Sequence, residues 1–233
     1  MIEIVYDNYE RGGEVRSAWG FSCVVEGGGP TVLFDTGGDG EVLLHNMAVL
    51  DRPAGAIDCV VLSHNHWDHI GGLEDFLSKN GNVEVYMPSG FPSRLRELVH
   101  ERGGEVVDNT AGSQISADLL VTPVWGDEIE EEGLLVREGD EWILLTGCAH
   151  PGITRMVGGA EDYLDKDVNS VIGGFHMKDD WNTAINRTVA DLRMMGVTGV
   201  GPCHCSGDAA REKMKLVFGE NYLDVGIGTE IGG

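Results

Sequence analysis

Residues 57–63, IDCVVLS, contain the continuous apolar and β-branched run Cys59, Val60, Val61 and Leu62. Such a run is typical of a β-strand that is buried on both faces. Other strand-like runs are bounded by turn residues and cover residues 2–6, 19–26, 31–38, 83–87, 114–124, 133–138, 141–147, 168–174 and 198–205. Helical patterns occupy residues 92–104, 183–197 and 207–219, and a further helix is expected from about Ile70. Two strand-rich halves that each carry helices predict an α/β fold, a four-layer αββα sandwich that forms a single domain over residues 1–233.

The chain is strongly acidic, with 16 Lys and Arg against 39 Asp and Glu and a formal net charge of -23. A surface of this sign repels phosphate backbones, and no basic cluster offsets it, which argues against a nucleic-acid partner. Two interpretations of the acidic surface stay open: ordinary solvation, or adaptation to high intracellular salt, which screens self-repulsion.

Targeting and membrane signals are not found in this sequence. No apolar run approaches the roughly 20 residues of a membrane-spanning helix. The start, MIEIVYDNYERGGEV, lacks the basic-then-apolar order of a signal peptide. We therefore expect a soluble, cytoplasmic protein that has no membrane partner, and its oligomeric state is left open.

Five cysteines, an odd number scattered along the chain, predict reduced thiols and not a disulfide framework. Cys23 and Cys59 lie in strand-like apolar runs, so we expect them in the core. Cys148 and the pair Cys203 and Cys205 each lie beside a histidine.

The stretch LSHNHWDHIGGL, residues 62–73, places His64, His66, Asp68 and His69 directly after the buried strand. Alternate residues of an extended segment point the same way, so His64 and His66 can offer two imidazoles to one ion. Asp68 and His69, where the chain turns into a helix, would reach a second ion. Imidazole with carboxylate favours zinc, iron or manganese over calcium. The spacing therefore predicts a site for two divalent transition-metal ions, most simply zinc.

The residues HNHWDHIGG (64–72) resemble the H-x-H-x-D-H signature of the metallo-β-lactamase-fold hydrolases, and LFDTGG (33–38) is similar to an earlier motif of that superfamily. Three later motifs are LLTGCAHPGI (144–153), IGGFHM (172–177) and GPCHCSG (201–207). Together they resemble a narrower branch, the dihydropterin/aminobenzene ribofuranosyl-phosphate synthase-like proteins. The resemblance implies the αββα metallo-β-lactamase sandwich with a mono- or dinuclear metal site between its sheets.

The resemblance also implies further ligands. Many relatives carry a Gly-Asp step where this chain has Gly147 and Cys148, and the aspartate bridges both metals. We infer that His150 is a ligand here, while Cys148 is a thiolate ligand, a neighbour of a ligand or a packed thiol. His204 stands where the superfamily places its last ligand histidine. Its neighbours in the sequence, Cys203 and Cys205, are expected to pack away from the metal if the chain is extended there.

Other residues near these motifs are assigned to structure or to substrate. Asp35 is expected to bond backbone or a ligand imidazole. His176, on a Gly-Gly turn, is expected to contact substrate or donate a proton. Ser206 and Gly207 precede a helix that begins near Asp208, so they are candidates to bind an anionic group of the substrate, although Asp208 capping the helix is an equal alternative.

Two metal ions held in this way would activate a water molecule, which favours hydrolysis of an ester, lactone or phosphoester of a small, anionic molecule. Asp68 would bind metal and orient the hydroxide, and His176 would protonate the leaving group. One alternative is a metal-dependent synthase or transferase that acts on a dihydropterin-like or ribose-phosphate substrate. Another is an iron-dependent redox protein or a non-enzymatic metal-binding protein.

Overall fold

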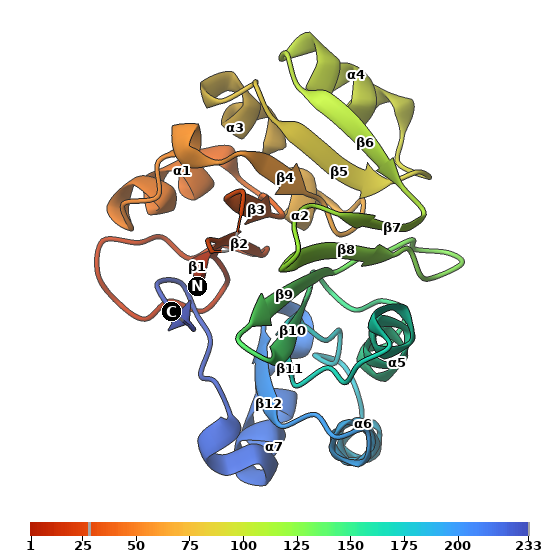
Figure 1. The fold of residues 1–233 in the computed structure, drawn as a ribbon. Coiled ribbons are helices and arrows are strands. Elements are labelled where there is room, and N and C mark those ends of the chain that lie inside the picture. Colours follow the sequence, from red (N-terminus) through yellow and green to blue (C-terminus); the bar gives the residue numbers. More distant parts are fainter. Residues whose placement is uncertain (28, 233) are drawn as a thin grey trace.

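The computed structural model describes residues 1–27 and 29–232, and two β-sheets pack face to face at its centre (Figure 1). The first sheet has the strand order β13 (Glu230–Ile231), β1 (Ile2–Tyr6), β2 (Ser22–Val25), β3 (Val32–Phe34), β4 (Cys59–Val61), β5 (Glu84–Pro88) and β6 (Glu105–Asn109). The second has the order β12 (Gly199–Cys203), β11 (Ser170–Gly174), β10 (Glu141–Thr146), β9 (Leu134–Glu138), β8 (Leu119–Pro123) and β7 (Ala111–Gln114).

Helices cover the outer face of each sheet (Figure 1). Helices α1 (Gly40–Val49), α3 (Leu73–Lys79) and α4 (Ser93–Glu101) pack on the first sheet. Helices α5 (Ile153–Leu164), α6 (Asn182–Met194) and α7 (Asp208–Phe218) pack on the second. Short 3₁₀ turns cover Ala54–Ala56, His204–Ser206 and Gly219–Asn221, and the four-residue helix α2 (Trp67–Ile70) follows β4. The predicted four-layer αββα sandwich is confirmed.

Alternation along the strands builds three apolar layers from one chain. In β4, Cys59 and Val61 face the core between the sheets, while Val60 faces the layer under α1, α3 and α4. In β10, Leu145 enters the same inter-sheet core, and Leu144 packs under the other helices. A strand with apolar residues at every position is thus buried on both faces, as the run at residues 57–63 predicts.

The helix expected from about Ile70 begins at Leu73 as α3, and the four-residue helix α2 precedes it, with a break at Gly71 and Gly72. A Cβ on Gly71 would lie 2.4 Å from the carbonyl oxygen of Gly38, and one on Gly72 would lie 2.2 Å from that of Thr36. The two glycines therefore let this segment pass directly against the loop after β3. This close approach fixes the position of α2.

The ends of five strands define where chemistry can take place. Strands β3 and β4 are parallel neighbours in the first sheet, and β10, β11 and β12 are parallel neighbours in the second. The chain leaves all five at their carboxyl ends directly into the sequence motifs described above. Loops at such strand ends are the usual place for binding and catalytic groups.

Two further expectations can be compared with the structure. All five cysteines are free thiols, as predicted, and Cys23 and Cys59 are buried in the core between the sheets. Within the described part of the chain, no helix combines the length and the apolar character needed to cross a membrane.

Candidate metal centre

Six predicted ligands lie together where the carboxyl ends of these strands meet, in two groups of three. One group joins His64 and His66, from the segment between β4 and α2, with His150, from the turn after β10. The other joins Asp68 and His69, on α2, with His204, which follows β12. Within each group the ligand atoms lie no more than 4.8 Å apart. The sequence prediction thus names side chains that the fold brings together; that they bind ions stays a prediction.

The spacing of the nitrogen atoms fits ions held between them. His66 Nδ1 is 3.1 Å from His64 Nε2 and 3.2 Å from His150 Nε2. In the second group, His204 Nε2 is 3.3 Å from His69 Nε2 and 3.3 Å from Asp68 Oδ2. An ion with metal–nitrogen bonds of about 2.0–2.1 Å and tetrahedral angles holds its ligand nitrogens about 3.3 Å apart. These separations are close to those around a tetrahedral, zinc-like ion.

Burial keeps most of these imidazoles neutral, which is the form that binds metal. Desolvation lowers the pKa of His64 and His204, and it lowers the pKa of His150 to about 3. His69 differs: burial lowers its pKa, but the adjacent Asp35 carboxylate outweighs burial and the pKa is raised. Burial would raise the pKa of Asp68, but the hydrogen bond from His204 and the charges of His69 and His204 together outweigh it, and the pKa is lowered. The second group therefore contains an anionic ligand.

Asp35 and Ser63 fix the rings of two histidines from behind. Asp35 Oδ2 accepts a hydrogen bond from His69 Nδ1 at 2.7 Å and another from the Ser63 hydroxyl at 2.7 Å. The Ser63 hydroxyl oxygen in turn lies 2.9 Å from His64 Nδ1. With Nδ1 occupied, the Nε2 atoms of both rings face the site, as is usual for metal-binding histidines. The structural role expected for Asp35 is confirmed, while Ser63 was not predicted.

The segment directly after β1 holds His204 in place, which the sequence motifs do not reveal. Asn8 Oδ1 is 2.9 Å from His204 Nδ1, and Asp7 Oδ1 accepts the backbone N–H of His204 at 3.0 Å. Asn8 is 196 positions away in the sequence, and nothing in its local sequence distinguishes it. Only the fold, which places the segment after β1 against the segment after β12, brings it there.

Glu131 shapes the turn that carries His150. This carboxylate is fully buried and accepts backbone hydrogen bonds from Cys148 at 2.9 Å, from Ala149 at 2.8 Å and from His150 at 2.8 Å. Burial raises the pKa of Glu131 to about 7 despite these bonds. Glu131 lies in an acidic loop, DEIEEE (127–132), whose composition predicts a solvated surface. Its role was therefore missed.

Left-handed backbone is concentrated at the site. Asp35 (φ 56°), Ala149 (φ 56°), His176 (φ 51°) and His204 (φ 47°) are four of the six non-glycine residues with positive φ in the described part of the chain. Such conformations cost energy for residues with a Cβ and persist where the surroundings enforce them. Each of the four lies just past a strand end, where the chain turns at the site.

The thiols of Cys148 and Cys205 are in contact at the site. Cys148 Sγ lies 3.2 Å from His69 Nε2 and 3.2 Å from Cys205 Sγ. The expectation that Cys205 packs away from the metal is therefore wrong, because residues 204–206 form a 3₁₀ turn and strand alternation does not apply. Cys203, still inside β12, does face the core between the sheets, as expected. Cys148 thus stays a candidate ligand or a neighbour of a ligand.

A pocket of about 350 Å³ opens over these groups. It is lined by Trp19, His66, Trp67, Asp68, Cys148, His150, His176 and Cys205. The exposed His176 ring stands at its rim, with its centroid 4.3 Å from that of His150. A side-chain hydrogen bond with Cys205 raises the pKa of His176, which favours a protonated ring. His176 is thus placed to meet a bound molecule.

Ser206 and Gly207 do not reach this pocket, and their expected role in anion binding is corrected. The Ser206 hydroxyl is fully buried, accepts the N–H of Phe175 at 3.0 Å and donates to the Gly173 carbonyl at 3.3 Å. A Cβ on Gly207 would lie 2.5 Å from Lys178 Cα, so this backbone is covered. The alternative also fails, because the Asp208 side chain does not cap α7 and instead accepts a hydrogen bond from the Tyr9 hydroxyl at 2.8 Å.

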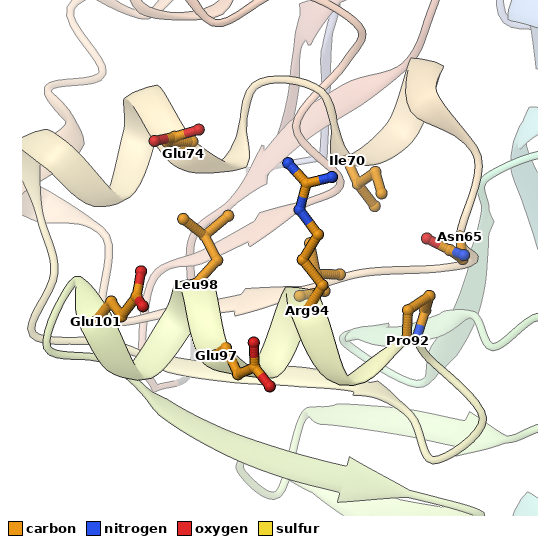
Figure 2. A pocket seen from close by; sticks show the side chains of 9 residues that line it. Asn65, Ile70, Glu74, Pro92, Arg94, Glu97, Leu98 and Glu101 are labelled. Carbon is orange, nitrogen blue, oxygen red and sulfur yellow. The ribbon is translucent and has the colours of Figure 1, made fainter.

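A second pocket, of about 590 Å³, lies between α4 and the α2–α3 segment (Figure 2). Arg94 points into it from α4, and Glu74 lies across it on α3. Asn65 stands at its edge, and the pocket shares Asn65 and Ile70 with the stretch HNHWDHIGG (64–72). Its lining contains no histidine or cysteine, so the metal chemistry belongs to the smaller pocket.

Comparisons with known proteins agree with this geometry. The family model described as Metallo-beta-lactamase superfamily matches residues 20–166. A 7,8-dihydropterin-6-methyl-4-(beta-D-ribofuranosyl)-aminobenzene-5'-phosphate synthase of Methanocaldococcus jannaschii is 28% identical over 82% of this chain and 80% of that protein. An uncharacterized protein of the same organism is 26% identical over 100% of both chains.

A solved structure shares the fold over the whole chain. The crystal structure of Tm1679, described as a metal-dependent hydrolase of the beta-lactamase superfamily, superimposes with a TM-score of 0.80 at 24% identity. The superposition covers 100% of this chain and 99% of that one. Since the family match extends over more than half of the residues and the fold and ligand motifs agree with it, this chain belongs to the metallo-β-lactamase superfamily.

Proposed function

We propose that this protein is a metal-dependent hydrolase that holds two divalent transition-metal ions, most simply zinc, and cleaves an ester, lactone or phosphoester. The observation that carries the proposal is the pair of three-residue donor groups, His64, His66 and His150 beside Asp68, His69 and His204, under one open pocket. Nitrogen and oxygen donors in this number suit zinc, with manganese or iron as alternatives.

Two ions bound there would lower the pKa of a water molecule and polarise the carbonyl or phosphoryl oxygen of a substrate. The chain supplies the remaining steps. Asp68, whose pKa is lowered, is anionic and orients the nucleophile as well as binding metal. The hydrogen bond with Cys205 raises the pKa of His176, and the ring lies at the rim beside His150, so His176 is assigned as the proton donor to the leaving group.

The charges around the pocket support an anionic small-molecule substrate that enters from one side. The Lys178 ammonium lies 4.5 Å above the Trp19 ring, and that ring lies 4.9 Å from the His204 ring. On the other side of His66, a neighbouring hollow is lined by Asp127, Glu128 and Glu130. An anionic group is therefore expected to bind on the side of Lys178 and to avoid the acidic hollow.

Metal analysis and a substrate panel test the proposal. The purified protein should contain about two transition-metal ions per chain and hydrolyse at least one member of a panel of phosphoesters, lactones and carboxylic esters. His66→Ala should lose metal and activity, whereas His100→Ala, on the exposed side of α4, should lose neither. Full metal content and activity in His66→Ala would refute the assignment.

The roles of His176 and Lys178 have their own readouts. His176→Gln should lower kcat with metal content unchanged, and the loss should be smallest for substrates whose leaving group needs no proton. Lys178→Ala should raise KM for anionic substrates with little change in kcat, while Lys166→Ala, at an exposed site after α5, serves as the control. Equal KM values for anionic and neutral substrates in both proteins would contradict the binding side.

A second candidate function is synthesis, supported by the similarity to the M. jannaschii synthase over 82% of this chain. In that case the pocket would join a dihydropterin-like molecule to an aminobenzene ribofuranosyl phosphate. Incubation of the metal-loaded protein with both molecules, followed by mass spectrometry, tests it directly. A coupled product that depends on His66 would favour synthesis over hydrolysis.

A further inference from the structure

Cys148 and Cys205 form a pair of thiols at the floor of the metal centre. Their Sγ atoms are 3.2 Å apart, although the two residues are separated by 57 positions in the sequence. Sulfur atoms in a disulfide are about 2.05 Å apart. Side-chain rotations that shorten the distance between the two sulfur atoms by little more than 1 Å would therefore bring them to bonding distance.

These two thiols differ from the other three in access. Cys148 and Cys205 both contribute to the lining of the pocket over the site, although each side chain is largely buried. Cys23, Cys59 and Cys203 are buried in the apolar core between the two sheets. A small polar oxidant that enters the pocket can therefore reach Cys148 and Cys205, whereas the three cysteines in the core are shielded from it.

The surroundings of the pair supply hydrogen-bonding groups for thiol chemistry. The backbone N–H of His176 donates to Cys205 Sγ at 3.3 Å, and His69 Nε2 lies 3.2 Å from Cys148 Sγ. Because the two sulfur atoms are in contact and each has a polar neighbour, one can be oxidised to a sulfenic acid and the other can attack that sulfur and release water.

We propose that Cys148 and Cys205 are a redox-active dithiol that a hydroperoxide converts into a disulfide inside the metal centre. With hydrogen peroxide, the first thiol becomes a sulfenic acid as the O–O bond breaks and one water leaves. The second sulfur attacks that sulfur, the S–S bond forms and a second water leaves. The two sulfurs together lose two electrons and two protons, and the peroxide gains them.

The disulfide would tie together the two segments that carry predicted ligands of different ions. Cys148 lies two residues before His150, and Cys205 directly follows His204. Oxidation also removes both thiols from a third possible donor group, Cys148, His176 and Cys205. The proposal concerns the thiols themselves and does not depend on which substrate the enzyme cleaves.

The test is peptide mapping of the metal-containing protein after mild treatment with hydrogen peroxide and alkylation of the remaining thiols. The number of free thiols in the denatured protein should fall from five to three, a Cys148–Cys205 linked peptide should appear, and dithiothreitol should restore all five. Five unchanged thiols, or a linked peptide that joins other cysteines, would overturn the proposal.

Variants separate this pair from general oxidation. Cys148→Ser and Cys205→Ser should each abolish the linked peptide, while Cys59→Ala, in the inter-sheet core, should still form it. Because wild-type mapping alone identifies the bond, a variant that fails to fold leaves the proposal testable. Accumulation of sulfinic acid at either cysteine without any linked peptide would also count against it.

Discussion

Replacement of Glu131 should loosen the turn that carries His150, and two variants isolate the energy. Glu131 Oε1 accepts the N–H groups of Cys148 and Ala149, and Oε2 accepts that of His150. Glu131→Gln keeps one carbonyl oxygen for two of these donors and leaves one unpaired. Glu131→Ala leaves all three unpaired.

The difference between the two variants gives the magnitude. Both remove a carboxyl whose pKa burial raises to about 7, so the cost of burying that charge cancels between them. Each buried N–H left without a partner costs about 1–2 kcal/mol. Glu131→Ala should therefore be less stable than Glu131→Gln by about 2–4 kcal/mol, a large part of the 5–15 kcal/mol typical of a folded domain.

Urea denaturation and metal analysis measure this effect. Glu130→Ala is the matched control, because Glu130 accepts only one exposed N–H, that of Gly90. It should change the free energy of unfolding by less than about 0.5 kcal/mol. We expect Glu131→Ala to bind less metal as well, since the His150 backbone loses its acceptor. Equal stability of Glu131→Ala and Glu131→Gln would refute the reasoning.

Three further predictions concern metal and pH. His150→Ala and His204→Ala should each lower the metal content by about one ion per chain, measured by mass spectrometry of the bound elements, whereas His100→Ala should not. Cys148→Ser should change the absorption spectrum of the cobalt-substituted protein if the thiol is a ligand, and an unchanged spectrum would exclude direct ligation. Burial raises the pKa of Glu132 well above 4.5, so the folded state holds its proton more tightly and stability should fall as pH rises above that value. Glu132→Gln should remove a slope of up to about 1.4 kcal/mol per pH unit from urea-derived stabilities between pH 5 and 7, and parallel profiles for both proteins would contradict this.

Most strands could be predicted because their apolar runs are continuous, and the exceptions have physical reasons. Strand β6 (Glu105–Asn109) was missed because it is an edge strand with partly exposed residues, so its sequence EVVDN lacks a buried pattern. Helix α5 was missed because it contains Gly158 and Gly159, which weaken a helical pattern. Gly159 is required there, since a Cβ would lie 2.7 Å from the Trp125 ring.

The clustering of the candidate ligands could be predicted because histidine and aspartate are metal-binding residue types and stand at a regular spacing. Asp35 was expected behind a ligand, but three other supporting residues could not be predicted. Ser63 is an ordinary polar residue, Asn8 comes from the far end of the chain, and Glu131 is one of several acids in a loop. Each becomes informative only when the fold places an acceptor or a hydroxyl behind a ligand.

The errors around His204 have a single cause. Both the expectation that Cys205 turns away and the expectation that Ser206 faces the substrate assume an extended chain that runs directly into a helix. His204 instead adopts φ 47°, and the 3₁₀ turn that follows rotates the next two side chains. Cys205 therefore reaches Cys148, while the Ser206 hydroxyl is buried against the backbone of β11. A non-glycine residue with positive φ has no signature in the sequence, because the surrounding packing and not local preference imposes it. One such residue thus decides which side chains line the metal centre, and it decides that a thiol pair lies there.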